Sequence, residues 1–254
     1  RDVTEQQELA ERRVDVTRMI VHDLRNPIST LMSTMSMLQA QLTPNFDESA
    51  AELLHNAQRG CVDMLDMVDS LLDMTRIEAG KMVLDAEAIY VEPLLERVVE
   101  RIRPLAQQRR IELLFEMPER KTAVWADEDM VRRVLINLID NGLKFTPAGG
   151  TVHCRIEPDD HAENGHEPGI RCIICDNGPG ISAEHHERIF DRFMRTNEGG
   201  ALVRGTGLGL AFCKLAVEAH NGRIWFEAAP QGGSCFVFTL LGEPHFAPAQ
   251  LSPK

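Results

Sequence analysis

The strongest constraint on the fold is the apolar pattern of the segment Met19–Leu42, MIVHDLRNPISTLMSTMSMLQAQL. On a helix that turns about 100° per residue, its apolar positions form one narrow stripe: Ile20, Leu24, Ile28, Leu31, Met35, Leu38 and Leu42. His22 lies roughly 160° from the centre of this stripe, so we expect its imidazole to face solvent. Asp23 is beside it and Asn26 is one turn further on. A lone surface histidine commonly has no role, so the rest of the chain must decide what this one does.

A second helix is expected from Asp47, a good capping residue, to about Ala79, before Gly80. It carries a heptad seam of Leu54, Ala57, Cys61, Met64, Val68, Leu71 and Thr75. The break at Thr43–Phe46 makes the two helices an antiparallel hairpin, into which the charged, helix-prone segment Arg1–Thr17 leads. One hairpin cannot bury both stripes, so residues 1–80 are predicted to form a homodimer with a four-helix bundle.

Beyond Gly80 the pattern changes to short strands mixed with helices. Strands are expected at Lys81–Ala86, Ile111–Glu116, Thr122–Trp125, Thr151–Ile156, Ile170–Cys175, Arg223–Ala228 and Ser234–Leu241. Helices are expected at Val91–Gln108, at Glu128–Leu143 after the capping residue Asp127, at Ser182–Phe193 and at Leu208–His220. This order predicts an α/β sandwich over residues 81–242, with one mixed, mostly antiparallel sheet and helices on one face. Residues 243–254 are expected to be a disordered tail.

Composition narrows the possible partners. The 254 residues are 43% hydrophobic and 26% charged, as in ordinary globular domains. The net charge of −12 argues against nucleic acid as a partner. No apolar run is long enough to span a bilayer, so membrane contact is expected only through unseen N-terminal parts of a parent protein, and a cytoplasmic location is predicted. Cys172 and Cys175 have a C-x-x-C spacing, but they read as core residues of a strand with reduced thiols rather than as a metal or redox pair.

One group of polar residues has the spacing of a magnesium and phosphate site. Asn137, Asn141 and Lys144 are four and three residues apart, so they share one face of the expected helix. Two amide oxygens suit Mg²⁺ held mainly by phosphate, and Lys144 adds a point charge for that phosphate. An ordinary polar helix face is the equally open alternative for this stretch taken alone.

Three further stretches add the parts of a nucleotide site. Asp176-Asn-Gly-Pro-Gly-Ile181 follows a strand, where a carboxylate can accept from the exocyclic amine of adenine, although the same letters make a good plain turn. Gly205-Thr206-Gly207-Leu208-Gly209 precedes a helix and can hold an anion, although a lone G-x-G-x-G is weak. Arg195 follows IFDRFM and precedes Thr196–Arg204, which is predicted to be a lid.

Taken in their order along the chain, the four stretches resemble the N, G1, F and G2 boxes of the ATP-binding domain of sensor histidine kinases. His22–Pro27, HDLRNP, resembles their H box, within a HisKA-type dimerisation and phosphoacceptor domain. The resemblance covers about Arg18 to Leu241, nearly the whole chain. It implies ATP and Mg²⁺ as cofactors and the receiver domain of a response regulator as the partner.

The resemblance also implies a role for each matching residue. His22 would accept the phosphoryl group, Asp23 would act as its base, and Asn26 would place water for phosphatase activity. Asn141 would bind Mg²⁺ beside Asn137. Asp176 would bind the adenine. The remaining positions would also bind the nucleotide: Lys144, Phe145, Gly178, Gly180, Ile181, Arg195, Gly205, Thr206, Gly207, Leu208 and Gly209. Phe145 stands where a Tyr is frequent, so a stacking face is kept without its hydroxyl.

Two other functions remain open from the residues. A non-kinase ATPase of the same superfamily would share three of the boxes but would lack a phosphoacceptor hairpin. A signalling scaffold regulated by nucleotide would be expected to lack the phosphoacceptor or the metal-binding Asn, and both are present here. We therefore expect an autophosphorylating histidine kinase that passes phosphate to an aspartate of a response regulator.

Overall fold

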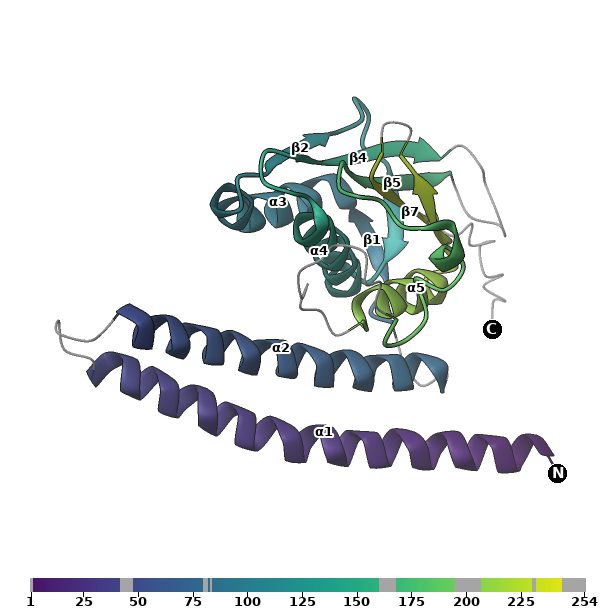
Figure 1. The fold of residues 1–254 in the computed structure, drawn as a ribbon. Helices are drawn as coiled ribbons and strands as arrows, with labels where there is room; N and C mark the ends of the chain where they lie inside the picture. The colour runs from purple at the N-terminus through teal and green to yellow at the C-terminus, as the bar shows by residue number, and fades with distance from the viewer. Residues whose placement is uncertain are drawn as a thin grey trace, which may run out of the picture. The chain divides into compact units, whose positions relative to one another are not determined.

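The computed structural model describes residues 2–41, 48–79, 82, 84–159, 168–194, 207–229 and 232–243, without some helical side chains, notably those of residues 2–15 and of His22. The chain divides into two compact units, Arg1–Met82 and Val83–Lys254. The first is a pair of long helices, and the second combines helices with sheet (Figure 1). Within the described residues no helix is both long enough and apolar enough to cross a bilayer.

The first unit is an antiparallel helical hairpin. Helix α1 spans Asp2–Gln41 and α2 spans Glu48–Glu78, so the charged N-terminal segment does continue into the helix that carries His22 (Figure 1). The expected turn and cap at Thr43–Asp47 lie outside the described residues. Val21, Val68 and Leu72 form the buried cluster of the hairpin. Arg25 on α1 pairs with Asp69 on α2, which adds a polar tie between the helices.

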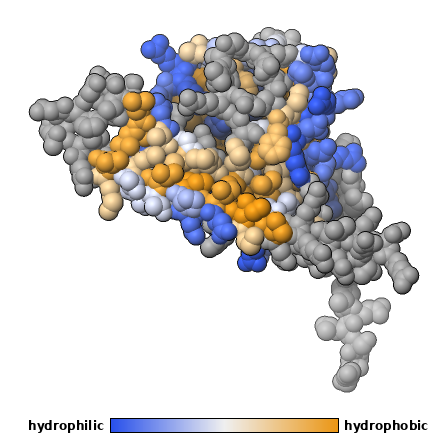
Figure 2. All heavy atoms as spheres, turned by 60° about the horizontal axis from the view of Figure 1, so that its bottom comes forward, coloured by the Kyte–Doolittle hydropathy of each residue, from blue (hydrophilic) through white to orange (hydrophobic). Residues whose placement is uncertain are grey.

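Much of the predicted stripe on α1 is exposed in the single chain. Ile28 is buried, whereas Ile20, Leu24, Leu31 and Leu38 are all between 44% and 50% exposed. Figure 2 turns the helices to the viewer and shows apolar side chains gathered in a band. The exposed large apolar residues of this unit are Val16, Met19, Ile20, Leu24, Leu31, Met37, Leu38, Leu53, Val62 and Met64. One hairpin therefore leaves most of its stripe unburied.

The second unit is built on a five-stranded sheet in the order β2-β4-β5-β7-β6. Its strands are β2 (Glu112–Glu116), β4 (Thr151–Asp159), β5 (Gly169–Asp176), β6 (Ile224–Ala228) and β7 (Ser234–Leu240). Strands β2 and β4 are parallel and the other neighbours are antiparallel, which confirms the mixed, mostly antiparallel sheet. The loop that joins β4 to β5 lies outside the described residues.

Three helices cover one face of this sheet (Figure 1). They are α3 (Val91–Gln108), α4 (Glu128–Phe145) and α5 (Gly209–Ala219), as predicted to within two residues at each end. Alternation along the strands sends one set of side chains towards the helices, and that set is the core: Val152, Cys154, Ile156, Ile170, Cys172, Ile174, Phe236, Phe238 and Leu240.

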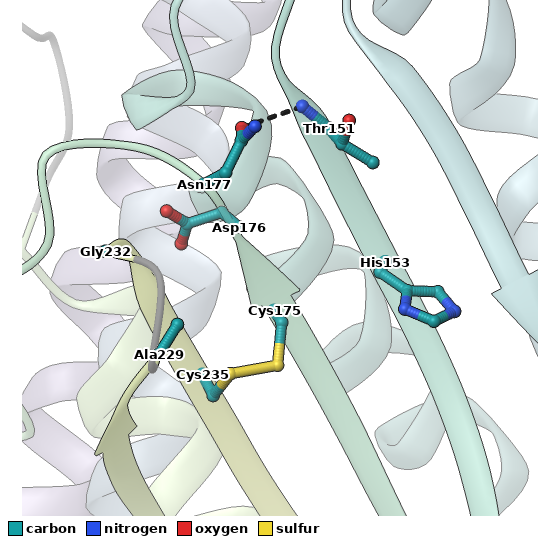
Figure 3. A pocket seen from close by; sticks show the side chains of 8 residues that line it. All are labelled: Thr151, His153, Cys175, Asp176, Asn177, Ala229, Gly232 and Cys235. Carbon is teal, nitrogen blue, oxygen red and sulfur yellow. Dashed lines mark hydrogen bonds between the residues drawn. A yellow bond between two sulfur atoms is a disulfide. The ribbon is translucent and has the colours of Figure 1, made fainter.

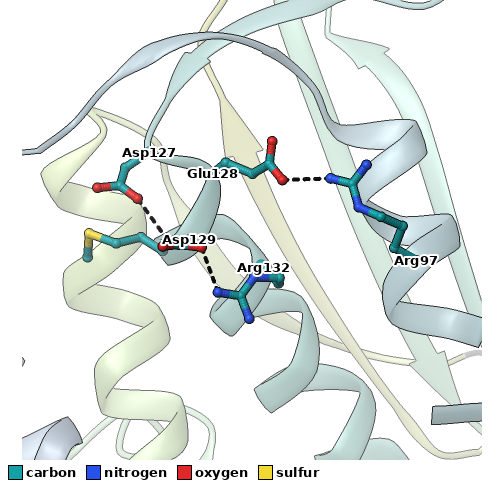
Figure 4. Close-up of polar contacts among 6 residues, drawn as sticks. Arg97, Asp127, Glu128, Asp129 and Arg132 are labelled. Carbon is teal, nitrogen blue, oxygen red and sulfur yellow. Dashed lines mark hydrogen bonds and ion pairs between the residues drawn. The ribbon is translucent and has the colours of Figure 1, made fainter. Parts of the chain in front are cut away.

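The start of α4 is fixed by polar contacts of its first turn (Figure 4). The side chain of Asp127 accepts a hydrogen bond from the Met130 N–H at 3.1 Å, which confirms the predicted cap. Arg97 of α3 donates to Glu128 at 2.6 Å, and Asp129 pairs with Arg132 one turn later. These contacts fix the N-terminal end of α4, whereas Asn137, Asn141 and Lys144 lie in the C-terminal half of the helix.

One strand prediction was wrong. Residues 82 and 84–86 form no strand, and the strand β1 is instead Glu87–Tyr90. It pairs with β3 (Ala123–Ala126) in a separate two-stranded antiparallel sheet, so the unit has two sheets rather than one. The tertiary partner decides the boundary, because Ile89 packs at the buried Val124, whereas the Asp85 N–H donates to the Asp127 carboxylate instead of to a ladder.

The prediction of a helix at Ser182–Phe193 was also wrong. Only a short 3₁₀ helix, η1 (Ala183–His185), forms, and Ser182 provides no side-chain cap for it. The following residues make turns up to Phe193, which has a φ of 59°. Burial of Ile189 and an edge-on contact of Phe190 with Phe236 hold this segment against the sheet, so tertiary packing replaces helical hydrogen bonds.

The cysteine prediction was right for Cys172 and wrong for Cys175. Cys172 is a buried free thiol in the core. Cys175 forms a disulfide with Cys235, which faces it across β5 and β7 with 4.1 Å between the Cα atoms. The C-x-x-C spacing relates two cysteines of one strand, whereas the disulfide joins two cysteines that are 60 residues apart in sequence.

Candidate active site

The predicted phosphoacceptor stretch lies in the middle of α1. The side chain of His22 lies outside the described residues, and those of Asp23 and Asn26 are exposed. Pro27 stands inside the helix and has no N–H to donate to the carbonyl of Asp23. The Thr30 hydroxyl donates to the Asn26 carbonyl at 3.0 Å, one turn further on. The helix therefore runs unbroken through HDLRNP despite one missing backbone hydrogen bond.

The N-box residues share one half-buried face of α4. Asn137, Asn141 and Lys144 are all partly exposed, whereas Leu135, Leu138 and Ile139 on the opposite face of the helix are fully buried. Lys144 Nζ lies 2.6 Å from the carboxylate of Asp140. Asp140 is a site neighbour that sequence analysis missed, although its four-residue spacing from Lys144 was a visible signal.

The G1 stretch meets the C-terminal end of α4. Asp176 is the last residue of β5 and is only 7% exposed. A Cβ at Gly178 would come within 2.8 Å of the Phe145 carbonyl, so only glycine permits this approach of the two backbones. The Nε2 of His186 donates to the Ile181 carbonyl at 2.8 Å and anchors the far end of the stretch. Gly180 has a φ of +78°.

The Asp176 carboxylate is held by backbone N–H groups. Gly178 donates to its Oδ1 at 2.9 Å, and the N–H of Ser234, at the start of β7, is a second donor. Burial raises the pKa of the Asp176 carboxyl above its ordinary value, and these two hydrogen bonds oppose the rise. Sequence analysis missed Ser234, because the contact depends on strand pairing between distant segments.

The G2 stretch joins the F stretch to α4. Gly207 has a φ of +68°, and its carbonyl accepts from the Phe193 N–H at 2.9 Å. Gly209 begins α5, and a Cβ there would lie 3.1 Å from Asn137 Oδ1. Leu208 is buried. Arg195, Gly205 and Thr206 lie outside the described residues, so their predicted phosphate contacts stay predictions.

Segments far apart in sequence therefore meet around α4. Gly209 lies against Asn137, Gly178 lies against Phe145, and a Cβ at Gly142 would lie 3.8 Å from the Asp176 Cβ. The arrangement offers amide oxygens, a lysine, a helix N-terminus and a buried carboxylate, which together match the polar and charged parts of a nucleoside polyphosphate.

The donor set fits a magnesium ion that is carried by phosphate. Among the described residues no group of three or more His, Cys, Asp or Glu side chains could hold a metal by itself. Asn137 and Asn141 offer hard amide oxygens one helical turn apart, and Mg²⁺ in such sites takes its other ligands from phosphate and water. Asn141 with Asn137 therefore fits the ion only as part of a metal–nucleotide complex.

The fold and site define a nucleotide-binding α/β sandwich that follows a helical hairpin, and comparison with known families agrees. Residues 12–80 match the model of the His Kinase A (phospho-acceptor) domain. Residues 126–244 match the model described as histidine kinase-, DNA gyrase B- and HSP90-like ATPase. The chain belongs to the sensor histidine kinases, the ATP-dependent protein kinases of two-component signalling.

Similar proteins share this assignment. The adaptive-response sensory kinase SasA of Rippkaea orientalis is 30% identical over 226 residues, which cover 87% of this chain and 56% of that protein. The sensor histidine kinase WalK of Bacillus subtilis is 30% identical over 240 residues, which cover 94% of this chain and 38% of that one. The chain thus spans a little over half the length of the first of these relatives and less of the second.

Solved structures show the same fold. The full-length ShkA structure in complex with AMPPNP matches with a TM-score of 0.72 at 23% identity, over 90% of this chain and 46% of that one. The nucleotide-free catalytic domain of the histidine kinase ThkA matches with a TM-score of 0.53 at 27% identity, over 63% of this chain and 99% of that domain.

Proposed function

We propose that this chain is a kinase core that transfers the γ-phosphoryl group of ATP to Nε2 of His22. The observation that carries the proposal is the convergence of Asn137, Asp176 and Gly209 from separate parts of the sequence around α4. Family membership and the AMPPNP bound to ShkA support a nucleotide as the ligand. Residues 1–80 would dimerise and present His22, and residues 81–242 would bind ATP.

Different residues of the sandwich would bind different parts of the nucleotide. Asp176, with its carboxylate already oriented by two N–H donors, would accept from the exocyclic amine of adenine. Phe145 would offer an apolar face to the base. Asn141 with Asn137 would hold Mg²⁺, and Lys144, Arg195 and the N–H groups of Gly205–Gly209 would hold phosphates. Lys144 would exchange its contact with Asp140 for one with phosphate.

The chemistry needs little more than placement. The lone pair of the neutral His22 Nε2 attacks the γ-phosphorus, the bond to the bridging oxygen breaks, and ADP leaves with that electron pair. Asp23 orients the ring and takes up the proton of the imidazole. A bound Mg²⁺ would supply charge neutralisation for the phosphates. The resulting phosphoramidate is labile, which suits transfer to an aspartate of a response regulator.

The exposed apolar face of the hairpin supports a homodimer. Ten large apolar side chains among the described residues of this unit are more than 40% exposed, and a second hairpin would cover them in a four-helix bundle. We also propose phosphatase activity, in which Asn26, exposed one turn from His22 in the sequence of the helix, would hold a water for hydrolysis of the regulator's phosphoaspartate.

The test is labelling with γ-phosphate-labelled ATP, comparing the wild type with His22→Gln. We expect acid-labile label on the wild type and none on the variant. The matched control is His153→Gln, since His153 lies on the uncovered face of the sheet, and it should keep full labelling. Label on His22→Gln, or none on the wild type, would overturn the proposal.

A further inference from the structure

The face of the sheet that no described helix covers holds a pocket of about 300 Å³ (Figure 3). It is lined from β4, β5 and β7, with Cys175, Cys235 and His153 among its residues. Strand alternation places Cys175 on this face, because its neighbours Ile174 and Asp176 are buried on the helical side. The disulfide therefore lines an open pocket on this face of the sheet.

This disulfide joins the two strands that hold the adenine-reading carboxylate. Cys175 precedes Asp176 on β5, and Cys235 follows Ser234 on β7. The Ser234 N–H donates to the Asp176 carboxylate, and the Gly233 backbone packs on the Asp176 carbonyl. The covalent bond thus lies one residue away from the contacts that orient Asp176.

The other cysteines are poorly suited to redox chemistry. Cys61, Cys154, Cys172 and Cys213 are all buried free thiols. Burial raises the pKa of Cys154 to about 12 and raises the pKa values of Cys172 and Cys213 still further, so none of these three forms a reactive thiolate near neutral pH. These three thiols are therefore poor attackers of the Cys175–Cys235 disulfide, which is the bond among the described residues with which a soluble thiol can exchange.

We propose that Cys175 and Cys235 form a redox-modification site that sets the nucleotide affinity of the neighbouring site. This inference rests on the proposed function, since it concerns the same nucleotide. The oxidised pair fixes β7 against β5 and keeps Asp176 in its binding orientation. The reduced pair lets these strand ends move, so the carboxylate must be ordered when the nucleotide binds, which weakens affinity.

The exchange uses a small dithiol as reductant. Its thiolate attacks one sulfur of the disulfide, and the other sulfur leaves with the electron pair and takes a proton. The second thiol of the reductant then displaces the first protein thiol. Two electrons pass to the protein, which gains two thiols, and the reductant becomes a cyclic disulfide.

The experiment measures ATP·Mg²⁺ affinity by calorimetry on the whole chain, oxidised or reduced with dithiothreitol. Alkylation followed by mass spectrometry scores the redox state, because reduction adds two reactive thiols. We expect the reduced protein to bind about fivefold more weakly, within the usual range of coupling between two sites. By linkage, ATP should make the reduction potential of the pair about 20 mV more negative.

Two variants separate the possible outcomes. The double variant Cys175→Ser, Cys235→Ser should bind like the reduced wild type under both conditions, and Cys154→Ala should keep the full response. Equal affinity of the oxidised and reduced wild type, tighter binding when reduced, or no disulfide in the oxidised sample would overturn the inference. Failure to bind ATP in every state would instead overturn the proposed function.

Discussion

The helical hairpin and the sandwich bury their apolar side chains to different extents. The hairpin has a small buried cluster of Val21, Val68 and Leu72, and ten large apolar side chains among its described residues are exposed. The sandwich buries whole rows of side chains between its sheet and three helices, including Phe212, Phe236 and Phe238 at 1% exposure or less. The sandwich thus buries its core as a single unit, whereas the hairpin would complete its core only in the proposed dimer.

This difference in burial fits the separate roles proposed for the hairpin and the sandwich. A nucleotide site needs groups held in fixed places, and Asp176, Asn137 and Gly209 are fixed by buried elements. A phosphoacceptor must be reached by other domains, and Asp23 and Asn26 beside it are exposed on one long helix. Predictions that affect one unit and leave the other unchanged test this separation.

The largest effect is expected from Asn141→Ala. Loss of the amide proposed to hold Mg²⁺ should lower autophosphorylation by about 10³-fold, because the metal would neutralise charge in the transition state. The dimer should be unaffected, since Asn141 belongs to the sandwich. Labelling rates measured beside sedimentation equilibrium check both statements. A variant that stays active within about tenfold would show that Asn141 is not the metal ligand.

The next largest effect is expected from Leu24→Glu. Leu24 is 44% exposed in the single chain, in the centre of the predicted stripe, so a charge there should weaken dimerisation by about 100-fold. Nucleotide affinity should not change. Sedimentation equilibrium measures the first quantity and calorimetry the second.

Ser33→Glu is the matched control for this charge. Ser33 is exposed on the opposite side of the same helix. Equal weakening of the dimer by both variants would mean that the apolar stripe is not the interface.

Local patterns predicted much of both units. The three and four spacing of Asn137, Asn141 and Lys144 placed them correctly on one helical face, because helical periodicity depends only on neighbours in sequence. The Asp127 cap was found for the same reason. The apolar stripe of α1 was also read correctly as a surface that one hairpin cannot bury.

Contacts across the sheet could not be predicted in this way. The Cys175–Cys235 disulfide and the Ser234 N–H on Asp176 depend on the register of β5 with β7, which no local pattern fixes. The boundary of β1 failed similarly, because its partner β3 lies more than 30 residues further along the chain. The Ser234 N–H group that helps to orient the Asp176 carboxylate therefore became visible only in the fold.

A smaller and more selective effect is expected from Asn26→Ala. This residue is exposed on the hairpin and carries no proton of useful pKa, so its role would be to place water rather than to transfer phosphate. Dephosphorylation of the partner regulator should fall by about tenfold or more, with autophosphorylation within about twofold of the wild type. Both rates are measured with the same labelled proteins. Equal loss of both activities would contradict the assignment.

The smallest effect is a pH dependence that belongs to the sandwich alone. His220 Nδ1 donates to the Ala216 carbonyl at 2.7 Å, and its Nε2 accepts from the Asp127 N–H at 3.0 Å. The ring is therefore neutral in the fold, and burial lowers its pKa below the ordinary value, against the opposing effects of Ala216 and Asp127. Between the folded and unfolded pKa values the unfolded chain binds more protons, so stability falls as pH falls through that window.

His220→Gln should remove this slope. Unfolding by urea can be followed by tryptophan fluorescence, since Trp125 and Trp225 both lie in the second unit. We expect the wild-type free energy of unfolding to decrease from about pH 7 to about pH 5 more steeply than that of the variant. Glutamine can keep an acceptor towards the Asp127 N–H but cannot be protonated in this range. Parallel slopes would show that His220 does not titrate against the start of α4, and that the sandwich loses stability in acid through other groups.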